Sequence, residues 1–129
     1  METLTDKKTR RWLALMHFGA RVGCHQMSER SFSFRGYQFP LCARCTGVVL
    51  GELFSIIAIL CTVRVSWIYA VALIIPLAID GSVQYVKIWE SNNVRRIITG
   101  ILAGFGLTYI YYYILFWIGR VIFKVVENA

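Results

Sequence analysis

Three long apolar stretches fill most of the chain after its first 45 residues. Each comes close to the roughly 20 residues that an α-helix needs to cross the hydrocarbon core of a bilayer. Arg64 separates the first two stretches, and polar turns at Asp80–Gly81 and at residues 90–93 precede the third. The pattern therefore predicts an all-α integral membrane protein with three transmembrane helices, at about 46–63, 65–86 and 96–119.

The residues before the first span carry a different pattern. Residues 5–23 mix apolar side chains such as Trp12 and Phe18 with basic ones, which predicts an amphipathic helix that lies in the membrane interface. Alternation of polar and aromatic residues from Ser31 to Phe34 predicts an extended segment or a hairpin. We therefore expect one membrane domain over 1–129, in which residues 1–45 form an N-terminal segment made of this helix and a Cys/His-containing loop.

Composition and charge agree with a membrane location and indicate an orientation. The sequence is 57% hydrophobic and 15% aromatic, more than a soluble domain of this size normally carries. The formal net charge of +7 is concentrated in residues 1–46, so the positive-inside rule predicts a multi-pass protein of the cell membrane with a cytoplasmic N-terminus. Arg10 and Arg11 interrupt the apolar core that a cleaved secretory signal would need. The basic residues form no recognisable module that reads nucleic acid, so the expected partner is the lipid bilayer.

Four residues near the first span have the chemistry of a metal site. Cys42 and Cys45 form a Cys-x2-Cys pair, a spacing that aims two thiolates at one tetrahedral ion. Cys24 and His25 can supply two more ligands, so the predicted metal set is Cys24, His25, Cys42 and Cys45, with zinc as the expected ion. Adjacent residues bind one ion only with a special backbone geometry. Three cysteines completed by water or by His17 are therefore an equally valid set.

Two other interpretations of the cysteine pair stay open. Cys42 and Cys45 can act as a redox-active dithiol, or they can be unpaired thiols at the membrane boundary. A cytoplasmic location disfavours a permanent disulfide, because that compartment keeps thiols reduced. Cys61 lies deep in an apolar stretch and is expected to pack there as a small hydrophobic residue.

Two carboxyl groups are predicted at membrane depth, where an ionised side chain is costly and usually has a partner. Glu52 lies on the face of the first span that also carries the second cysteine of the pair, and Asp80 lies near the end of the second span. One interpretation is an internal ion pair with Arg44, Arg95 or Arg96. The other is a polar pocket in which Asp80 or Glu52 acts as a catalytic base or a metal ligand beside the cysteines.

The start of the third span has the features of an anion site. Arg95 and Arg96 follow Glu90 and Asn93 at the N-terminal end of a helix, where backbone N–H and guanidinium groups bind phosphate or carboxylate. With Arg44, these residues form the predicted substrate-binding set, and an anionic lipid or another phosphate-bearing ligand is the expected occupant. The structural alternative is a capped helix whose arginines extend to the headgroups.

Small residues recur at one-turn spacing in the first and third spans. The motifs are Gly47-x3-Gly51 and Gly100-x3-Gly104, and they predict that helices approach one another closely. Three spans from one copy do not enclose a pore, so a transport function would require a homo-oligomer.

Taken together, the polar motifs resemble a known family. The stretches CHQMSERSFSFRGYQFPLCARCTG, DG with a following glutamine, and ESNNVRRIITG are similar to the pattern of the small prokaryotic integral membrane proteins grouped as domain of unknown function 2085. The similarity covers about residues 24 to 100 and implies that its polar residues form one site, but it implies no reaction. The residues that carry it are Cys24, His25, Arg30, Ser31, Phe32, Cys42, Arg44, Cys45, Thr46, Gly47, Asp80, Gln84, Glu90, Ser91, Asn93, Arg96, Thr99 and Gly100.

The sequence therefore predicts a multi-span membrane protein with a zinc-type Cys/His site at the cytoplasmic membrane boundary. We expect the metal to be structural, within a binding or assembly component. The alternatives are a metal-dependent membrane enzyme that acts on an anionic lipid-like substrate and a membrane thiol oxidoreductase that uses Cys42 and Cys45. Whether the protein is an enzyme is open at this stage.

Overall fold

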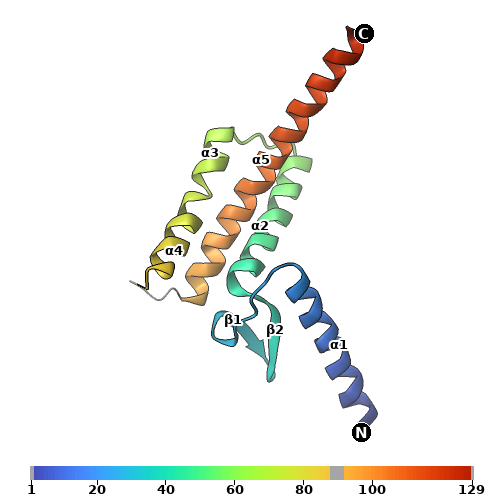
Figure 1. The fold of residues 1–129 in the computed structure, drawn as a ribbon, viewed down its shortest axis with the longest axis vertical. Coiled ribbons are helices and arrows are strands. Elements are labelled where there is room, and N and C mark those ends of the chain that lie inside the picture. The colour runs from blue at the N-terminus through green and yellow to red at the C-terminus, as the bar shows by residue number, and fades with distance from the viewer. Residues whose placement is uncertain (1, 88–91, 129) are drawn as a thin grey trace.

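The computed structural model describes residues 2–87 and 92–128 of the 129-residue chain (Figure 1). Three helical segments stand side by side as a bundle, and a small hairpin and a further helix extend from one end of it. The elements in chain order are α1 (Glu2–Arg21), the 3-10 turn η1 (Ser28–Arg30), β1 (Ser31–Phe34), β2 (Tyr37–Cys42), α2 (Ala43–Leu60), α3 (Trp67–Ala72), α4 (Ile75–Tyr85) and α5 (Asn93–Glu127).

Three helical segments of the described residues are long and apolar enough to cross a membrane, as the sequence predicts. They are α2, the combined α3 and α4 (Trp67–Tyr85), and α5. The second span is divided between Ala72 and Ile75. Pro76 explains the division, because it has no N–H to donate to the carbonyl of Ala72. The predicted fold class is thus confirmed, and residues 31–42 add the antiparallel hairpin of β1 and β2 to it.

Glycines let α2 and α5 pack backbone against backbone. A Cβ atom at Gly47 would lie 3.1 Å from the Cα of Gly100. One at Gly51 would overlap the carbonyl oxygen of Ile101, and one at Gly104 would overlap that of Val48. Neither helix can therefore carry a side chain at these positions without separating from the other. The two small-residue motifs face each other and give the close approach of helices that the sequence predicts.

The end of the bundle near residues 61–66 is held by neutral hydrogen bonds. The hydroxyl of Tyr109 donates to the carbonyl of Val63 at 2.8 Å, and that of Tyr113 donates to the carbonyl of Val65 at 2.6 Å. Both tyrosines belong to α5, so they tie it to the loop between α2 and α3. We call this the tyrosine end. Cys61, which we expected to pack in the interior, is instead exposed here, because α2 ends at Leu60.

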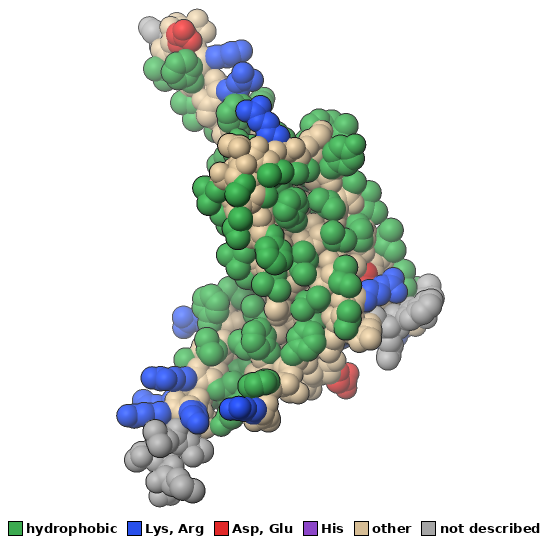
Figure 2. Space-filling view, turned by 180° about the vertical axis from the view of Figure 1, so that it is seen from behind, with side chains coloured by type: hydrophobic (Ala, Val, Ile, Leu, Met, Phe, Trp, Pro, Cys, Tyr) green, Lys and Arg blue, Asp and Glu red, His purple; other side chains and the backbone are tan. Residues whose placement is uncertain are grey.

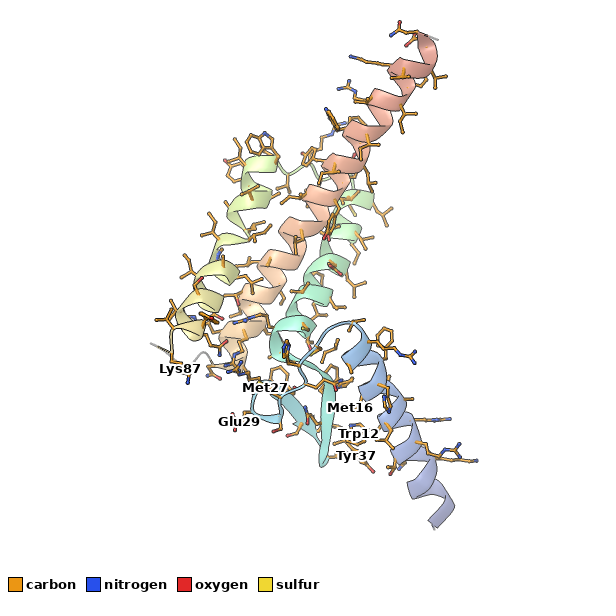
Figure 3. All side chains as sticks on the ribbon, in the orientation of Figure 1. Trp12, Met16, Met27, Glu29, Tyr37 and Lys87 are labelled. Carbon is orange, nitrogen blue, oxygen red and sulfur yellow. The ribbon has the colours of Figure 1, made fainter. Side chains whose placement is uncertain are left out.

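The opposite end carries the hairpin and α1. Trp12 donates from its indole Nε1 to the carbonyl of Gln38 at 2.8 Å, and its ring lies 5.8 Å from that of Tyr37, measured between centroids. Trp12, Met16 and Tyr37 are close together in Figure 3, where α1 lies along β2. Side-chain contacts therefore hold the predicted N-terminal helix against the hairpin.

The sides of the bundle are apolar and its ends are charged. Figure 2 shows hydrophobic side chains covering the middle of the molecule, with Lys and Arg side chains gathered beyond them. The sides of the bundle that carry these hydrophobic side chains are the ones that contact the lipid bilayer. Arg64, Arg120 and Lys124 lie toward the tyrosine end, and every other Lys and Arg of the sequence lies toward the end with the hairpin.

Candidate functional site

Three cysteines meet where α2 begins. Cys24 lies in the loop after α1, Cys42 is the last residue of β2, and Cys45 lies in the first turn of α2. Their Sγ atoms all lie within 4.8 Å of one another. The N–H of Cys42 donates to Sγ of Cys24 at 3.1 Å, and the N–H of Cys45 donates to Sγ of Cys42 at 3.5 Å. The cysteine cluster (Cys24, Cys42 and Cys45) therefore joins a loop, a strand and a helix, and we call this part of the molecule the cysteine end.

The loop after α1 turns tightly enough to bring Cys24 to this point. Gly23 has a φ of 81°, the left-handed conformation that glycine adopts at low cost. The side-chain amide of Gln26 then donates to the carbonyl oxygens of Met16 at 2.6 Å and Pro40 at 2.8 Å. These two bonds fasten the loop to both α1 and β2, so Cys24 is held beside the last residue of the strand.

Besides contributing a thiol to the cluster, Cys42 connects the hairpin to α2. It pairs with Ser31 in the hairpin, and with φ −68° and ψ 160° it is also the extended residue that precedes α2. Its sulfur accepts the N–H of Cys45, as an N-cap side chain does. The strand thus passes directly into the helix, which fixes the position of both cysteines of the Cys-x2-Cys pair.

The two histidines lie differently around the cluster. Among the residues that the structure describes, the group with metal-ligand spacing holds the three cysteines and not His25. His25 is exposed and lines the cavity that the cysteines also line, so its role as a ligand stays a prediction. His17 is exposed on α1, which ends at Arg21, and the described group with metal-ligand spacing does not include it.

The environment of Cys24 favours its thiolate. Burial acts to raise the pKa of the Cys24 thiol. Hydrogen bonds from the backbone N–H groups of Cys42 and Gln26, and from the side chains of Cys42 and Cys45, act in the opposite direction and outweigh it. The pKa of Cys24 therefore lies below its usual value. A thiolate is the form of cysteine that binds metal ions.

An ion-pair network lies beside the cluster and links the three spans. Asp80 is only 3% exposed, and its carboxylate accepts from Arg44 Nη2 at 2.7 Å and from Arg95 Nε at 3.1 Å. Arg44 Nη2 also donates to the side-chain oxygen of Gln84 at 3.2 Å. Since these residues come from α2, α4 and α5, the network holds the ends of the helices together. This is the internal ion pair that the sequence offered as one interpretation of Asp80.

A cavity of about 340 Å³ opens between the cluster and the helix ends. Its lining includes the three cysteines together with the guanidinium-bearing residues Arg30, Arg44 and Arg96. Met27, which also lines it, is labelled in Figure 3 at the foot of the bundle. Thiol and guanidinium groups from the loop, α2 and α5 therefore share one space.

Arg96 is the most deeply placed cation of this cavity. The residue is 7% exposed, and its Nη1 donates to Asn93 Oδ1 at 3.2 Å. Its Nε has no hydrogen-bond partner among the residues that the structure describes. Arg30 and Arg44 are close enough to Arg96 to repel it electrostatically, whereas Asp80 and Cys42 attract it. A buried guanidinium with like-charged neighbours is stabilised by an anion.

The other predicted site residues do not all reach the cavity. Glu52 is partly buried on α2 and is not part of the lining. Asn93 begins α5 and touches the site through Arg96, whereas Glu90 lies outside the described residues. Arg30 was not among the predicted ligand-binding residues, although it stands in the motif that carries the family resemblance. Periodicity could not assign it to the site, because it lies in the short turn η1 and not on a helix face.

The sequence comparisons point to membrane proteins without an assigned activity. The family model described as "Predicted membrane protein (DUF2085)" matches residues 24–110, which is more than half of the chain. The matched segment begins at the first cysteine of the cluster and includes the ion-pair network and both glycine motifs. No solved structure matches the chain.

Two similar proteins come from methanogenic archaea. An uncharacterized protein of Methanothermobacter thermautotrophicus is 46% identical over 91 residues, which cover 67% of this chain and 82% of that protein. An uncharacterized protein of Methanocaldococcus jannaschii is 37% identical over 93 residues, which cover 67% of this chain and 59% of that protein. The chain thus spans little more than half the length of the second relative.

Proposed function

The chain belongs to the DUF2085 family of membrane proteins, and we propose that its cysteine cluster binds one zinc-type ion at the membrane boundary. In this proposal the ion is structural. It fastens the loop after α1 to the start of α2, within a membrane component that binds or assembles with others.

The observation that carries the proposal is the convergence of three sulfur atoms. Thiolates bound tetrahedrally to zinc at about 2.3 Å lie about 3.8 Å from one another. The Sγ atoms of Cys24, Cys42 and Cys45 lie within 4.8 Å, so small rotations would complete this arrangement. The lowered pKa of Cys24 supports the same chemistry. His25 is the proposed fourth ligand, since it adjoins Cys24 and lines the same cavity.

Elemental analysis of the purified protein tests the proposal. We expect about one equivalent of zinc in the parent protein and a large loss in Cys24→Ala, Cys42→Ala and Cys45→Ala. Cys61→Ala is the matched control, because Cys61 is exposed at the other end of α2. A parent protein that holds no metal after supplementation with Zn²⁺ contradicts the proposal, as does equal loss in Cys61→Ala.

A metal-dependent enzyme is a second candidate, favoured by one observation. Three sulfurs leave a fourth position free, and the cluster faces the cavity that Arg30, Arg44 and Arg96 line. A catalytic metal would hold a water molecule there and would act on an anionic, lipid-like substrate. Asp80 and Glu52 remain the predicted candidates for the base. Zinc content that survives His25→Ala favours this open position, whereas loss of zinc favours the structural role.

The thiol oxidoreductase function rests on the Cys42 and Cys45 spacing alone. Zinc held tightly by both sulfurs would exclude it, because a metal-bound thiolate pair is not free for disulfide exchange.

We also propose that the cysteine end faces the cytoplasm. The distribution of Lys and Arg supports this orientation, since Arg64, Arg120 and Lys124 are the exceptions to the clustering at that end. A Ser66→Cys variant in a Cys61→Ala background, which removes the exposed native thiol at the same end, tests it with a membrane-impermeant maleimide on intact cells. Labelling of Ser66→Cys from outside is expected, and labelling only after the cells are lysed would reverse the proposed topology.

A further inference from the structure

Among the described residues, more cationic than acidic side chains line the cavity beside the cysteine cluster. Asp80 is shared between Arg44 and Arg95, so one carboxylate faces two guanidinium groups in that network. Arg96 donates to the neutral side chain of Asn93, and Asp80 also attracts it electrostatically, so this one carboxylate serves three guanidinium groups. Arg30 has an acidic neighbour in sequence, Glu29, which is exposed and lies on the outer side of the hairpin in Figure 3. In the described part of the chain, the cationic residues that line the cavity therefore outnumber the acidic ones.

Arg96 shows that this excess is built into the fold. The residue is more than nine-tenths buried and lines the cavity, and its Nε atom is unpartnered among the described residues. The Nε of Arg44, another lining residue, is buried and unpartnered in the same way. Two of the arginines that line the cavity therefore each have a buried Nε without an acceptor among the described residues, and Arg30 adds a third guanidinium group. Buried polar groups are normally hydrogen-bonded, and guanidinium groups make their strongest hydrogen bonds to anions such as phosphate and carboxylate.

We propose that this cavity binds a phosphoryl group with two negative charges, and that Arg96 and Arg30 are its main ligands. The guanidinium groups come from η1, α2 and α5, so they approach the cavity from three separate elements. A phosphoryl group presents three terminal oxygens in a tetrahedral array, whereas a carboxylate presents two oxygens in one plane. The convergence of three forks from three elements fits the first arrangement better.

The proposed site does not depend on the metal. Three thiolates with one Zn²⁺ ion carry a net charge of about −1, which would offset one guanidinium group and leave the others available. The cavity also lies at the end of the bundle, where the helices leave the apolar core. Phosphate groups occur at this level both in phospholipid headgroups and in soluble phosphate esters, so the two sources share one chemistry.

Two binding measurements separate the sources. In detergent, the purified protein is equilibrated with radiolabelled inorganic phosphate, and succinate is added as the carboxylate competitor. In nanodiscs, the bilayer is phosphatidylcholine alone, phosphatidylcholine with phosphatidic acid, or phosphatidylcholine with phosphatidylglycerol, and the retained lipid is identified by native mass spectrometry. Binding of inorganic phosphate indicates a soluble ligand. Retention of phosphatidic acid without binding of inorganic phosphate indicates a lipid headgroup.

Variants test the ligands. Arg96→Gln and Arg30→Gln should each weaken binding about tenfold or more, since each removes a charged hydrogen bond. Arg35→Gln has the same charge change on the exposed turn of the hairpin, where Arg35 stacks on Phe34, and should change binding less than about twofold. Arg30 is itself exposed, so Arg30→Gln keeps the test informative if the buried Arg96→Gln variant does not fold.

The outcomes that overturn the proposal are distinct from those that overturn the metal site. Failure of the parent to bind both inorganic phosphate and phosphatidic acid removes the phosphoryl site. The proposal also fails if phosphatidylglycerol is retained as well as phosphatidic acid, or if succinate competes as well as unlabelled phosphate does. It fails likewise if Arg35→Gln weakens binding as much as Arg96→Gln and Arg30→Gln do. Zinc is measured in the same samples. Phosphoryl binding without zinc would leave this inference standing and sink the metal proposal, and zinc without phosphoryl binding would do the reverse.

Discussion

The two ends of the helical bundle are built from different chemistry. At the tyrosine end, Tyr109 and Tyr113 donate to backbone carbonyls of a short loop, and the contacts are neutral. At the cysteine end, a carboxylate bridges Arg44 and Arg95 while three thiols lie within 4.8 Å of one another. The tyrosine end needs only to close a loop. The cysteine end gathers ionisable groups whose burial requires partners, and this is where a ligand would stabilise the fold most.

The contrast also shows how binding can be separated from span packing. The glycine contacts of α2 and α5 run between the two ends and use no ionisable group. A change at the cysteine end should therefore alter ligand binding and local stability first, whereas a change in the glycine contacts should loosen the whole bundle.

Asp80→Ala should give the largest effect. It leaves Arg44 and Arg95 without their shared carboxylate, and removal of one partner from a buried pair typically costs about 3–5 kcal/mol. Because both arginines are partly exposed, we expect about 3 kcal/mol of lost stability. The free energy of unfolding in detergent is the measurement. Glu29→Ala removes an exposed carboxylate and is the control. A loss of stability as large as that of Asp80→Ala would show that the buried ion pairs of Asp80 contribute nothing beyond an exposed carboxylate.

Removal of the proposed metal should act on one end only. A ligand present at about 100 times its Kd stabilises the folded state by about 2.7 kcal/mol, and a chelator removes that contribution. Hydrogen exchange should therefore accelerate in residues 22–30 but not in residues 61–66. Unchanged exchange in residues 22–30 would show that no ion fastens this loop.

Gly51→Ala should destabilise the bundle by about 2 kcal/mol, because the added methyl group would overlap the carbonyl of Ile101 and force α2 and α5 apart. Gly119→Ala is the matched change on α5, where a Cβ atom would meet nothing within 4 Å. It should cost nothing, since alanine favours a helix over glycine by up to about 1 kcal/mol. Thermal unfolding of both variants compares the two changes in stability. Equal destabilisation by Gly51→Ala and Gly119→Ala would argue against the close glycine contact.

Tyr109→Phe should give the smallest effect. It removes the hydrogen bond to the Val63 carbonyl and keeps the buried ring, so we expect a loss of about 1 kcal/mol. The zinc content should stay at the parent level. Tyr111→Phe, at a tyrosine that is 57% exposed, should leave stability unchanged. A drop in zinc content in Tyr109→Phe would mean that the two ends are not independent.

Much of the fold follows from the sequence because the bilayer restricts it. Apolar stretches of about 20 residues have few alternatives to spanning helices, and paired glycine motifs have a clear use where two helices meet. Pro76 could have predicted the division of the second span by the same physics. The length of α5 was harder to predict, because residues after Ile118 remain apolar enough to continue the helix to Glu127.

The candidate site was predictable only in part, because it depends on contacts between distant residues. The Cys-x2-Cys spacing located Cys42 and Cys45, and the side-chain chemistry suggested Cys24. Cys24 lies close to Cys42 because of the turn at Gly23 and the two hydrogen bonds from Gln26. Neither feature can be predicted from the periodicity of the sequence. Arg30 lines the cavity because of the position of the short turn η1, which periodicity does not predict either. Glu52 does not line it, although it lies on the same helix as Arg44 and Cys45.

The lengths of the helices make bilayer thickness a variable for this protein. At 1.5 Å per residue, α5 with 35 residues is about 52 Å long and α2 with 18 residues is about 27 Å long. A hydrocarbon core of about 30 Å matches α2 and is shorter than α5, which extends beyond its neighbours in Figure 1. A thicker membrane would therefore cover more of α5 without gaining anything on α2. Because the glycine contacts join the two helices, tilting of α5 in response to this mismatch would tilt α2 with it.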